Sequence, residues 1–69
     1  MLLDVLIPTY NRAGQLALTI ESLLTAPVPS GMSVAVTVID NNSNDGTRTM
    51  VESRMRSDDR LRYVFESQQ

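Results

Sequence analysis

The feature that most constrains this fold is a run at residues 34–39 that is apolar on both alternations of a strand. A strand with one solvated face alternates apolar and polar residues, whereas a strand of a parallel sheet is covered on both faces and reads as continuous. The run ends abruptly at Asp40, and residues 41–46 are a dense cluster of turn-forming residues. The pattern therefore predicts a buried strand of a parallel sheet.

Shorter apolar runs at residues 2–7 and 61–65 predict two further strands. Between the strands, apolar residues recur at helical spacing over residues 13–25 and again over residues 47–56. Alternation of this kind implies parallel strands joined by right-handed crossovers. We therefore predict an α/β fold, a β-α-β-α-β half of a Rossmann-like nucleotide-binding domain with three parallel strands and two helices on one face.

Each predicted helix has an apolar face and a polar residue placed to cap its N-terminus. Asn11 is the predicted cap of the first helix, and Asp45 or Ser43 is that of the second. The predicted core residues of the two helix faces are Leu16, Ile20, Leu23, Leu24, Met50, Val51 and Met55.

Composition excludes several ways of stabilising so small a fold. With 69 residues the chain can form one domain at most, and it contains no Cys and no His. Disulfides, thiolate metal sites and the commonest general base are therefore excluded. A single core in a chain this short contributes little net stability. We therefore predict that the isolated chain forms a homo-oligomer.

Charge and hydropathy exclude other partners. The net charge is −2 and no basic patch is evident, so no nucleic acid is expected. No apolar run approaches the roughly 20 residues that span a bilayer, and the first residues lack the features of a signal peptide. We predict a cytoplasmic location and no membrane segment in this chain, although a longer parent chain could be membrane-associated.

Two polar clusters, at residues 8–12 and 40–46, directly follow predicted strands. In a parallel α/β sheet the loops after the strands lie at the carboxyl edge, where ligands bind. If the first two strands are neighbours, the clusters face each other across one crevice. Helix N-termini that follow both loops favour anions. Side chains suited to a nucleotide, for stacking, hydrogen bonding and phosphate binding, are Tyr10, Asn11, Arg12, Asp40, Asn41, Ser43 and Asp45.

Structural roles compete with these functional ones. Asp45 can be no more than a turn residue and helix cap, Arg12 a solvated side chain and Tyr10 a packing residue. Asn42 and Asn44 are interpreted as turn formers only. For Asp40 the functional interpretation is slightly favoured, because a carboxylate that ends a buried strand is costly to desolvate without a partner or a purpose.

Residues 5–12 read Val-Leu-Ile-Pro-Thr-Tyr-Asn-Arg, and residues 38–47 read Val-Ile-Asp-Asn-Asn-Ser-Asn-Asp-Gly-Thr. In order and spacing they resemble the first two motifs of the large inverting glycosyltransferase family 2, which has the GT-A fold. The resemblance covers essentially the whole chain. It implies that residues 1–69 are a truncated N-terminal nucleotide-sugar-binding subdomain of such an enzyme.

The resemblance also implies roles for single residues. Pro8 and Tyr10 would frame the base of a nucleotide-diphosphate sugar donor. Asn41 would lie where the family often has an Asp that hydrogen-bonds the base, with Asp40 as the preceding acid; the amide leaves the identity of the base open. The complete predicted donor site is Pro8, Thr9, Tyr10, Asn11, Arg12, Asp40, Asn41, Ser43 and Asp45.

The family's metal-binding Asp-x-Asp motif and its general base would come later in a longer chain. No catalytic residue and no metal ligand is therefore predicted within these 69 residues. A divalent cation, Mg or Mn, is expected only in a full-length parent, and the chain alone is expected to be inactive. Asp58 and Asp59 are interpreted as a solvated turn at the opposite edge of the sheet. The sugar and the acceptor, which supplies a hydroxyl, stay open.

Two other interpretations compete with this one. A non-catalytic α/β interaction module would self-associate through the sheet face that the helices leave uncovered. A dinucleotide-binding domain would require Gly-x-Gly-x-x-Gly after the first strand, and residues 8–12 contain no Gly.

Overall fold

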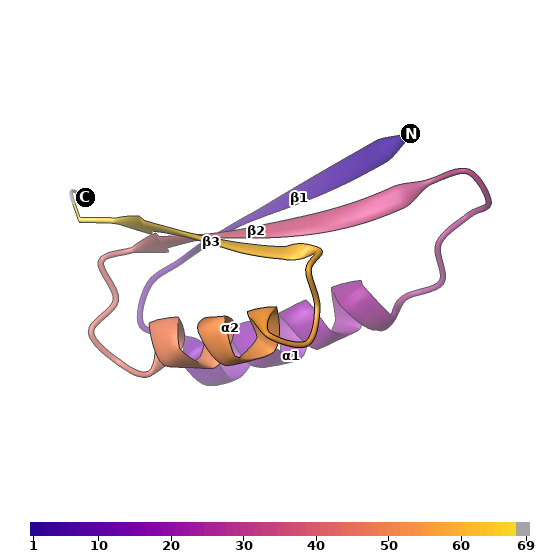
Figure 1. Cartoon of the computed structure of the whole chain (residues 1–69). Helices are drawn as coiled ribbons and strands as arrows, with labels where there is room; N and C mark the ends of the chain where they lie inside the picture. The colour runs from indigo at the N-terminus through magenta and orange to yellow at the C-terminus, as the bar shows by residue number, and fades with distance from the viewer. Residues whose placement is uncertain (68–69) are drawn as a thin grey trace.

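The computed structural model describes residues 1–67, and its elements follow the predicted order. The strands form one sheet in the order β1-β2-β3, and both pairs are parallel. Both helices lie on the same face of the sheet (Figure 1). The predicted α/β arrangement is confirmed. The elements are β1 (Leu2–Thr9), α1 (Ala13–Thr25), β2 (Ser33–Asn41), α2 (Thr47–Met55) and β3 (Leu61–Glu66).

The register of the sheet brings the ends of β1 and β2 together. Thr9 at the end of β1 lies opposite Asp40, and Asn41 at the end of β2 lies opposite Glu66 on β3. Because the strands run side by side in the same direction, the loops that follow them emerge at one edge. This arrangement is the condition on which the predicted donor site depended.

β1 and β2 both extend two residues beyond their predicted ends. β1 continues through Pro8, which pairs with Ile39, as far as Thr9. Proline usually ends a strand, but β1 is an edge strand, where a missing backbone donor can face solvent. β2 continues through Asp40 because Asp40 and Asn41 still have partners on β3. The functional loops are therefore shorter than the sequence indicated.

The core lies between the helices and the sheet. It is formed by six buried apolar residues from four of the five elements, with Ile20, Val36, Val38 and Val51 fully buried. The predicted apolar faces of both helices are confirmed. Leu16 and Leu61 complete the buried cluster, and Val5, Ile7, Leu23, Leu24, Val34, Met50, Met55 and Tyr63 pack against it.

The opposite face of the sheet is covered by no element among residues 1–67 (Figure 1). Leu2, Leu6 and Val64 alternate with core residues and are 63%, 59% and 50% exposed. On the central strand, Thr37 is buried and its hydroxyl donates to Asp4 Oδ1 at 3.2 Å. On this face the two edge strands therefore carry exposed apolar side chains, whereas Ala35 and Thr37 of the central strand β2 are buried.

Two smaller findings complete the fold. Within residues 1–67, neither helix combines the length and the apolar character that a bilayer crossing requires. β3 extends one residue beyond the predicted 61–65, through Glu66, and residues 68 and 69 lie outside the described part of the chain.

Candidate functional site

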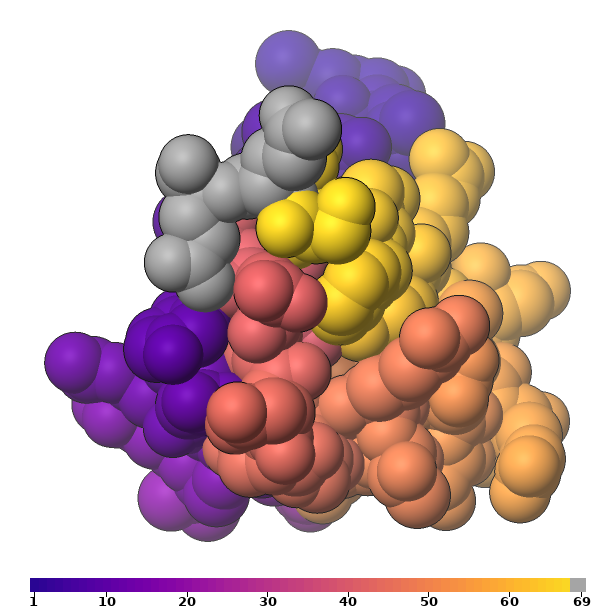
Figure 2. All heavy atoms as spheres, turned by 90° about the vertical axis from the view of Figure 1, so that its left-hand side faces the viewer, coloured from indigo at the N-terminus to yellow at the C-terminus, as the bar shows by residue number. Residues whose placement is uncertain are grey.

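The two polar loops lie against each other at the carboxyl edge of the sheet, which faces the viewer in Figure 2. Three hydrogen bonds join them across more than thirty residues of sequence. The amide of Asn11 donates to Ser43 Oγ at 2.8 Å, and the amide of Asn44 donates to Asn11 Oδ1 at 2.9 Å. The amide of Ala13 donates to Asp45 Oδ2 at 3.3 Å. The predicted convergence of the loops is therefore observed.

Asn11 joins the loops and does not cap α1, so the predicted capping role is wrong. The N-cap position of α1 is Arg12, and no side chain bonds there as a cap. Asn11 adopts a φ of 49°, in the left-handed region that Asn tolerates better than most residues. That conformation accompanies bonds from Asn11 to the second loop through both its amide and its side chain.

Asp40 is fully buried, and both of its carboxylate oxygens accept hydrogen bonds from the protein. The amide of Ser43 donates to Oδ1 at 2.9 Å, and the hydroxyl of Tyr63 donates to Oδ2 at 2.6 Å. Burial acts to raise the pKa of Asp40, but the bonds from Ser43 and Tyr63 outweigh it and place the pKa below its ordinary value. The burial of this charge is thus explained by its partners.

Tyr63 is a member of the site that sequence reasoning missed. Burial, followed by the hydrogen bond to Asp40, raises the pKa of the Tyr63 hydroxyl above its ordinary value. The Arg48 guanidinium lies 5.8 Å from the ring centres of both Tyr63 and Phe65. The only sequence signal for Tyr63 is its place in the third strand. That place is informative only once the register is known, in which Tyr63 lies one residue before Val64, the partner of Ile39.

The N-cap position of α2 is Gly46, and no side chain bonds there as a cap. The predicted cap, Asp45, lies one residue earlier and bonds to Thr47, the first residue of the helix. Its Oδ1 accepts from the amide of Thr47 at 3.0 Å and also from the Thr47 hydroxyl. These bonds, the one from the Thr47 hydroxyl first, lower the pKa of Asp45. Ser43, the alternative cap, instead accepts from Asn11.

Several predicted donor-binding groups remain accessible at this edge. Tyr10 is 50% exposed, Arg12 and Pro8 are exposed, and Asn41 is half-buried. A hollow of about 170 Å³ beside the first loop is lined by Pro8, Thr9 and Arg12 together with residues of β1 and α1. Tyr10 and Asn41 do not line this hollow. The structure thus brings the nine predicted residues to one edge but divides them between buried and accessible groups.

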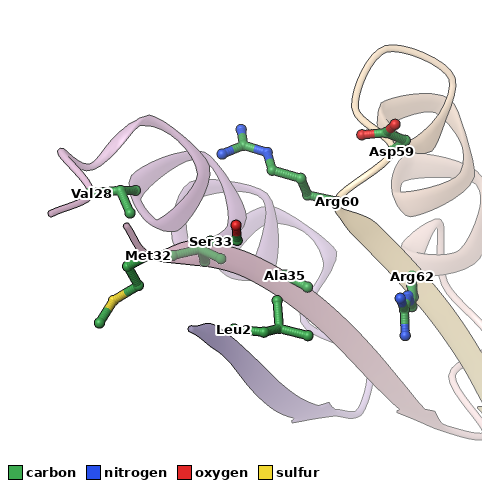
Figure 3. Close-up of a pocket in the computed structure, with 9 residues that line it drawn as sticks. Leu2, Val28, Met32, Ser33, Ala35, Asp59, Arg60 and Arg62 are labelled. Carbon is green, nitrogen blue, oxygen red and sulfur yellow. The ribbon is translucent and has the colours of Figure 1, made fainter. Parts of the chain in front are cut away.

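A larger hollow, of about 410 Å³, lies at the opposite, amino edge of the strands and includes Met32, Asp59, Arg60 and Arg62 (Figure 3). The guanidinium of Arg60 has a structural role there, because it donates to both carboxylate oxygens of Asp58 and to the carbonyl oxygen of Leu24. The side-chain bond from Arg60 lowers the pKa of Asp58 to about 2. The interpretation of Asp58 and Asp59 as a turn away from the candidate site is confirmed.

A divalent cation does not fit the carboxyl edge as it stands. Among residues 1–67, no three His, Cys, Asp or Glu side chains gather to hold a metal ion. Both oxygens of Asp40 and both oxygens of Asp45 already accept hydrogen bonds from the protein. We therefore derive no step through a cation from these residues.

Three parallel strands, crossover helices on one face and polar loops at the carboxyl edge define a Rossmann-like α/β unit. The family model described as glycosyl transferase family 2 matches residues 4–69. The chain belongs to this family. The resemblance drawn from the two sequence motifs is therefore confirmed.

One curated relative is a GalNAc(5)-diNAcBac-PP-undecaprenol beta-1,3-glucosyltransferase of Campylobacter jejuni subsp. jejuni. It is 33% identical over 63 residues, which are 91% of this chain. The matched region spans only 19% of that protein's length. No solved structure matches the chain at a significant level.

Proposed function

We propose that this chain is the donor-binding portion of a glycosyltransferase that transfers a sugar from a nucleoside diphosphate to an acceptor hydroxyl. The observation that carries the proposal is the set of three hydrogen bonds that hold the two family motifs together at the carboxyl edge. Family membership supports glycosyl transfer in general, and the printed name of the relative, a glucosyltransferase, is consistent with it.

The accessible residues would contact the donor. Tyr10, half exposed at the end of β1, would stack on the base, with Pro8 beside it. Arg12 would bind a phosphate oxygen through its planar guanidinium. Asn41 can both donate and accept, so it would read the edge of the base.

The remaining predicted residues would act by holding these groups in place. Asp40 is buried and bonds to Tyr63 and Ser43, so it would orient the turn that follows Asn41 without touching the donor. Asn11 and Ser43 bond to each other across the two loops. In this proposal the nine predicted residues therefore form a contacting group and a supporting group.

Binding of nucleotides to the chain tests the proposal. Titration of UDP, dTDP and GDP, with NAD as the comparison, is followed by shifts of the backbone amides of the two loops. We expect one of the three diphosphates to bind in preference to NAD. Tyr10→Ala should weaken that binding about tenfold, because base stacking on an aromatic ring contributes roughly 1–3 kcal/mol.

Tyr10→Phe is the matched control, because it keeps the ring and removes only the hydroxyl. It should retain the affinity of the parent chain. Equal binding of NAD and all three diphosphates, or full affinity in Tyr10→Ala, would contradict the assignment.

The chain by itself is predicted not to transfer sugar. The family resemblance assigns cation binding and the general base to motifs that these 69 residues do not contain, and both aspartates at the carboxyl edge already accept hydrogen bonds from the protein. The purified chain is incubated with nucleotide-sugars, Mg²⁺ or Mn²⁺ and a range of acceptors. Release of nucleoside diphosphate coupled to sugar transfer would overturn this prediction.

A second candidate function, self-association, is favoured by the uncovered sheet face. Its exposed Leu2, Leu6 and Val64 form an apolar surface, and Asp4 and Arg62 lie on opposite edge strands. If two copies pack with their uncovered faces together, a two-fold axis between the sheets and parallel to β2 would place β1 of one copy over β3 of the other. Asp4 of each copy would then approach Arg62 of the second, so we propose a second copy of this chain as the occupant of the face.

A further inference from the structure

One carboxylate at the carboxyl edge serves the N-termini of both helices. Asp45 Oδ2 accepts from Ala13, the first residue of α1, at 3.3 Å. Asp45 Oδ1 accepts from Thr47, the first residue of α2, at 3.0 Å. The side chain of Asp45 is exposed, so the two helix ends converge on a negative charge at the surface of the site.

A helix N-terminus ordinarily attracts anions. Its first amides have no partner within the helix, and the aligned peptide dipoles leave a partial positive charge there. Such ends bind phosphate groups in many nucleotide sites, and the sequence alone suggested that they favour anions here. In this structure the first amide of each helix already donates to Asp45. An approaching phosphate would therefore meet a carboxylate where a free helix end would have attracted it.

We propose that Asp45 is a positioning residue that joins the two helix N-termini and excludes the donor phosphates from them, so that this edge selects for the nucleoside. The inference rests on the proposed function, since it concerns how the same site treats a nucleoside diphosphate. The positioning role is supported independently by the bonds between Asn11 and the second loop, which join the same two segments.

The arrangement leaves Arg12 as the cationic group of the first loop at this edge. Arg12 is exposed and lines the hollow beside Pro8 and Thr9, which neither Asp45 nor Thr47 lines. A donor whose base stacks on Tyr10 can direct its phosphates along Arg12 toward solvent. The diphosphate would therefore add little to the affinity that the nucleoside provides.

The first experiment needs no ligand. Amide resonances of Ala13 and Thr47 are followed from pH 7 to pH 2 in the parent chain. Because one carboxylate accepts from both amides, both resonances should move with one common midpoint, below the ordinary aspartate value of about 3.9. Asp45→Asn should abolish that shared transition. Separate midpoints, or the same transition in Asp45→Asn, would overturn the joining role.

The second experiment compares affinities for a nucleoside and for its diphosphate without divalent cation. In the parent chain the two should agree within about threefold, since exposed charge interactions of this kind are weak. In Asp45→Asn the diphosphate should gain about fivefold over the nucleoside, because the repelling charge is gone while the shape is kept. An unchanged ratio would overturn the exclusion of phosphate.

Two further variants keep this result interpretable. Asp59→Asn removes the same charge from an exposed side chain at the opposite edge of the sheet and should leave the ratio as in the parent. Asp45→Ser keeps a good capping oxygen without the charge, and it replaces Asp45→Asn if circular dichroism shows that variant to be unfolded. If the parent binds no nucleoside and no diphosphate, the proposed function fails, whereas the amide titration still decides whether Asp45 joins the helices.

Discussion

At the scale of single residues, the polar groups of the carboxyl edge divide by what they bond to. Asp40 is fully buried and has two internal donors, whereas Tyr10 projects half exposed from the end of the neighbouring strand. A buried charge with one partner removed is left uncompensated, while an exposed ring loses little when it is altered. Loss of a partner of Asp40 should therefore lower the stability of the fold, whereas substitution of Tyr10 should leave the stability almost unchanged.

Tyr63→Phe should destabilise the fold without altering its shape. The change removes the hydroxyl that donates to Asp40 Oδ2 at 2.6 Å. A hydrogen bond to a charged group contributes about 1.5–3 kcal/mol, so a loss of that order is expected in urea unfolding. The matched control is Tyr10→Phe, which removes the other tyrosine hydroxyl of the sequence and should cost less than about 0.5 kcal/mol. Equal stability of the two variants would contradict the role of Tyr63.

Stability should fall as the solution becomes acidic. The pKa values of Asp40, Asp45 and Asp58 are all lower in the folded chain than the ordinary value of an aspartate. A group whose folded pKa is depressed stabilises the fold above its unfolded pKa, and that contribution is lost as pH falls through the folded pKa. Urea unfolding at pH 7, 4 and 3 should show little change to pH 4 and a clear loss by pH 3. A constant free energy over this range would contradict it.

At the scale of elements, each helix is held by the few side chains that it buries against the sheet. α1 buries Leu16 and Ile20, while Leu18 on its opposite side is 72% exposed. An amphipathic helix of thirteen residues is marginal in water by itself, so this packing is the source of its stability. The same applies to α2, which buries Thr47 and Val51.

Ile20→Ala should largely unfold the chain. Removal of a buried isoleucine side chain costs about 2–5 kcal/mol, and a domain of this size has little more than that in total. Leu18→Ala is the control on the same helix and should change the free energy of unfolding by less than about 0.5 kcal/mol. Far-ultraviolet circular dichroism with urea titration measures both. A cooperative transition of parental midpoint in Ile20→Ala would show that the core lies elsewhere.

At the scale of the whole molecule, two layers leave one sheet face without cover among residues 1–67 (Figure 1). The exposed Leu2, Leu6 and Val64 on that face are apolar groups available for association with a second copy. Isolated small domains of this kind depend on further burial to become stable. Stability and self-association should therefore be linked in this chain.

The chain should form a dimer or a larger assembly in solution. Light scattering at high micromolar concentration measures its mass, and Leu6→Asp should shift the population toward monomer by placing a charge on the apolar face. Leu18→Asp introduces the same charge on the exposed side of α1 and serves as the control. A monomeric parent chain that unfolds cooperatively would rule out the dimer.

The candidate site could be predicted from the sequence only in part. The locations of the two loops were predictable because Pro8 and Asp40 follow apolar runs, and strand ends of a parallel sheet share one edge. A bond from Asp45 to the start of the second helix was predictable from its place before a helical pattern, although the N-cap position is Gly46; its second bond, to Ala13, was not predictable. The role of Tyr63 and the bonding of Asn11 depend on register and loop conformation, which local sequence does not encode.

The sequence by itself determined the order of elements, the helix faces and the family, because hydrophobic periodicity and the two motifs are local properties of the chain. Only the tertiary structure decided which carboxylates are engaged internally and which side chains remain accessible. Asp40 and Asp45 are both acids at the carboxyl end of β2, one within the strand and one in the loop after it, and what separates their roles is which donors the fold brings to each oxygen. Burial and hydrogen bonding are properties of pairs of residues distant in sequence, so they appear only once the strands and loops are in place.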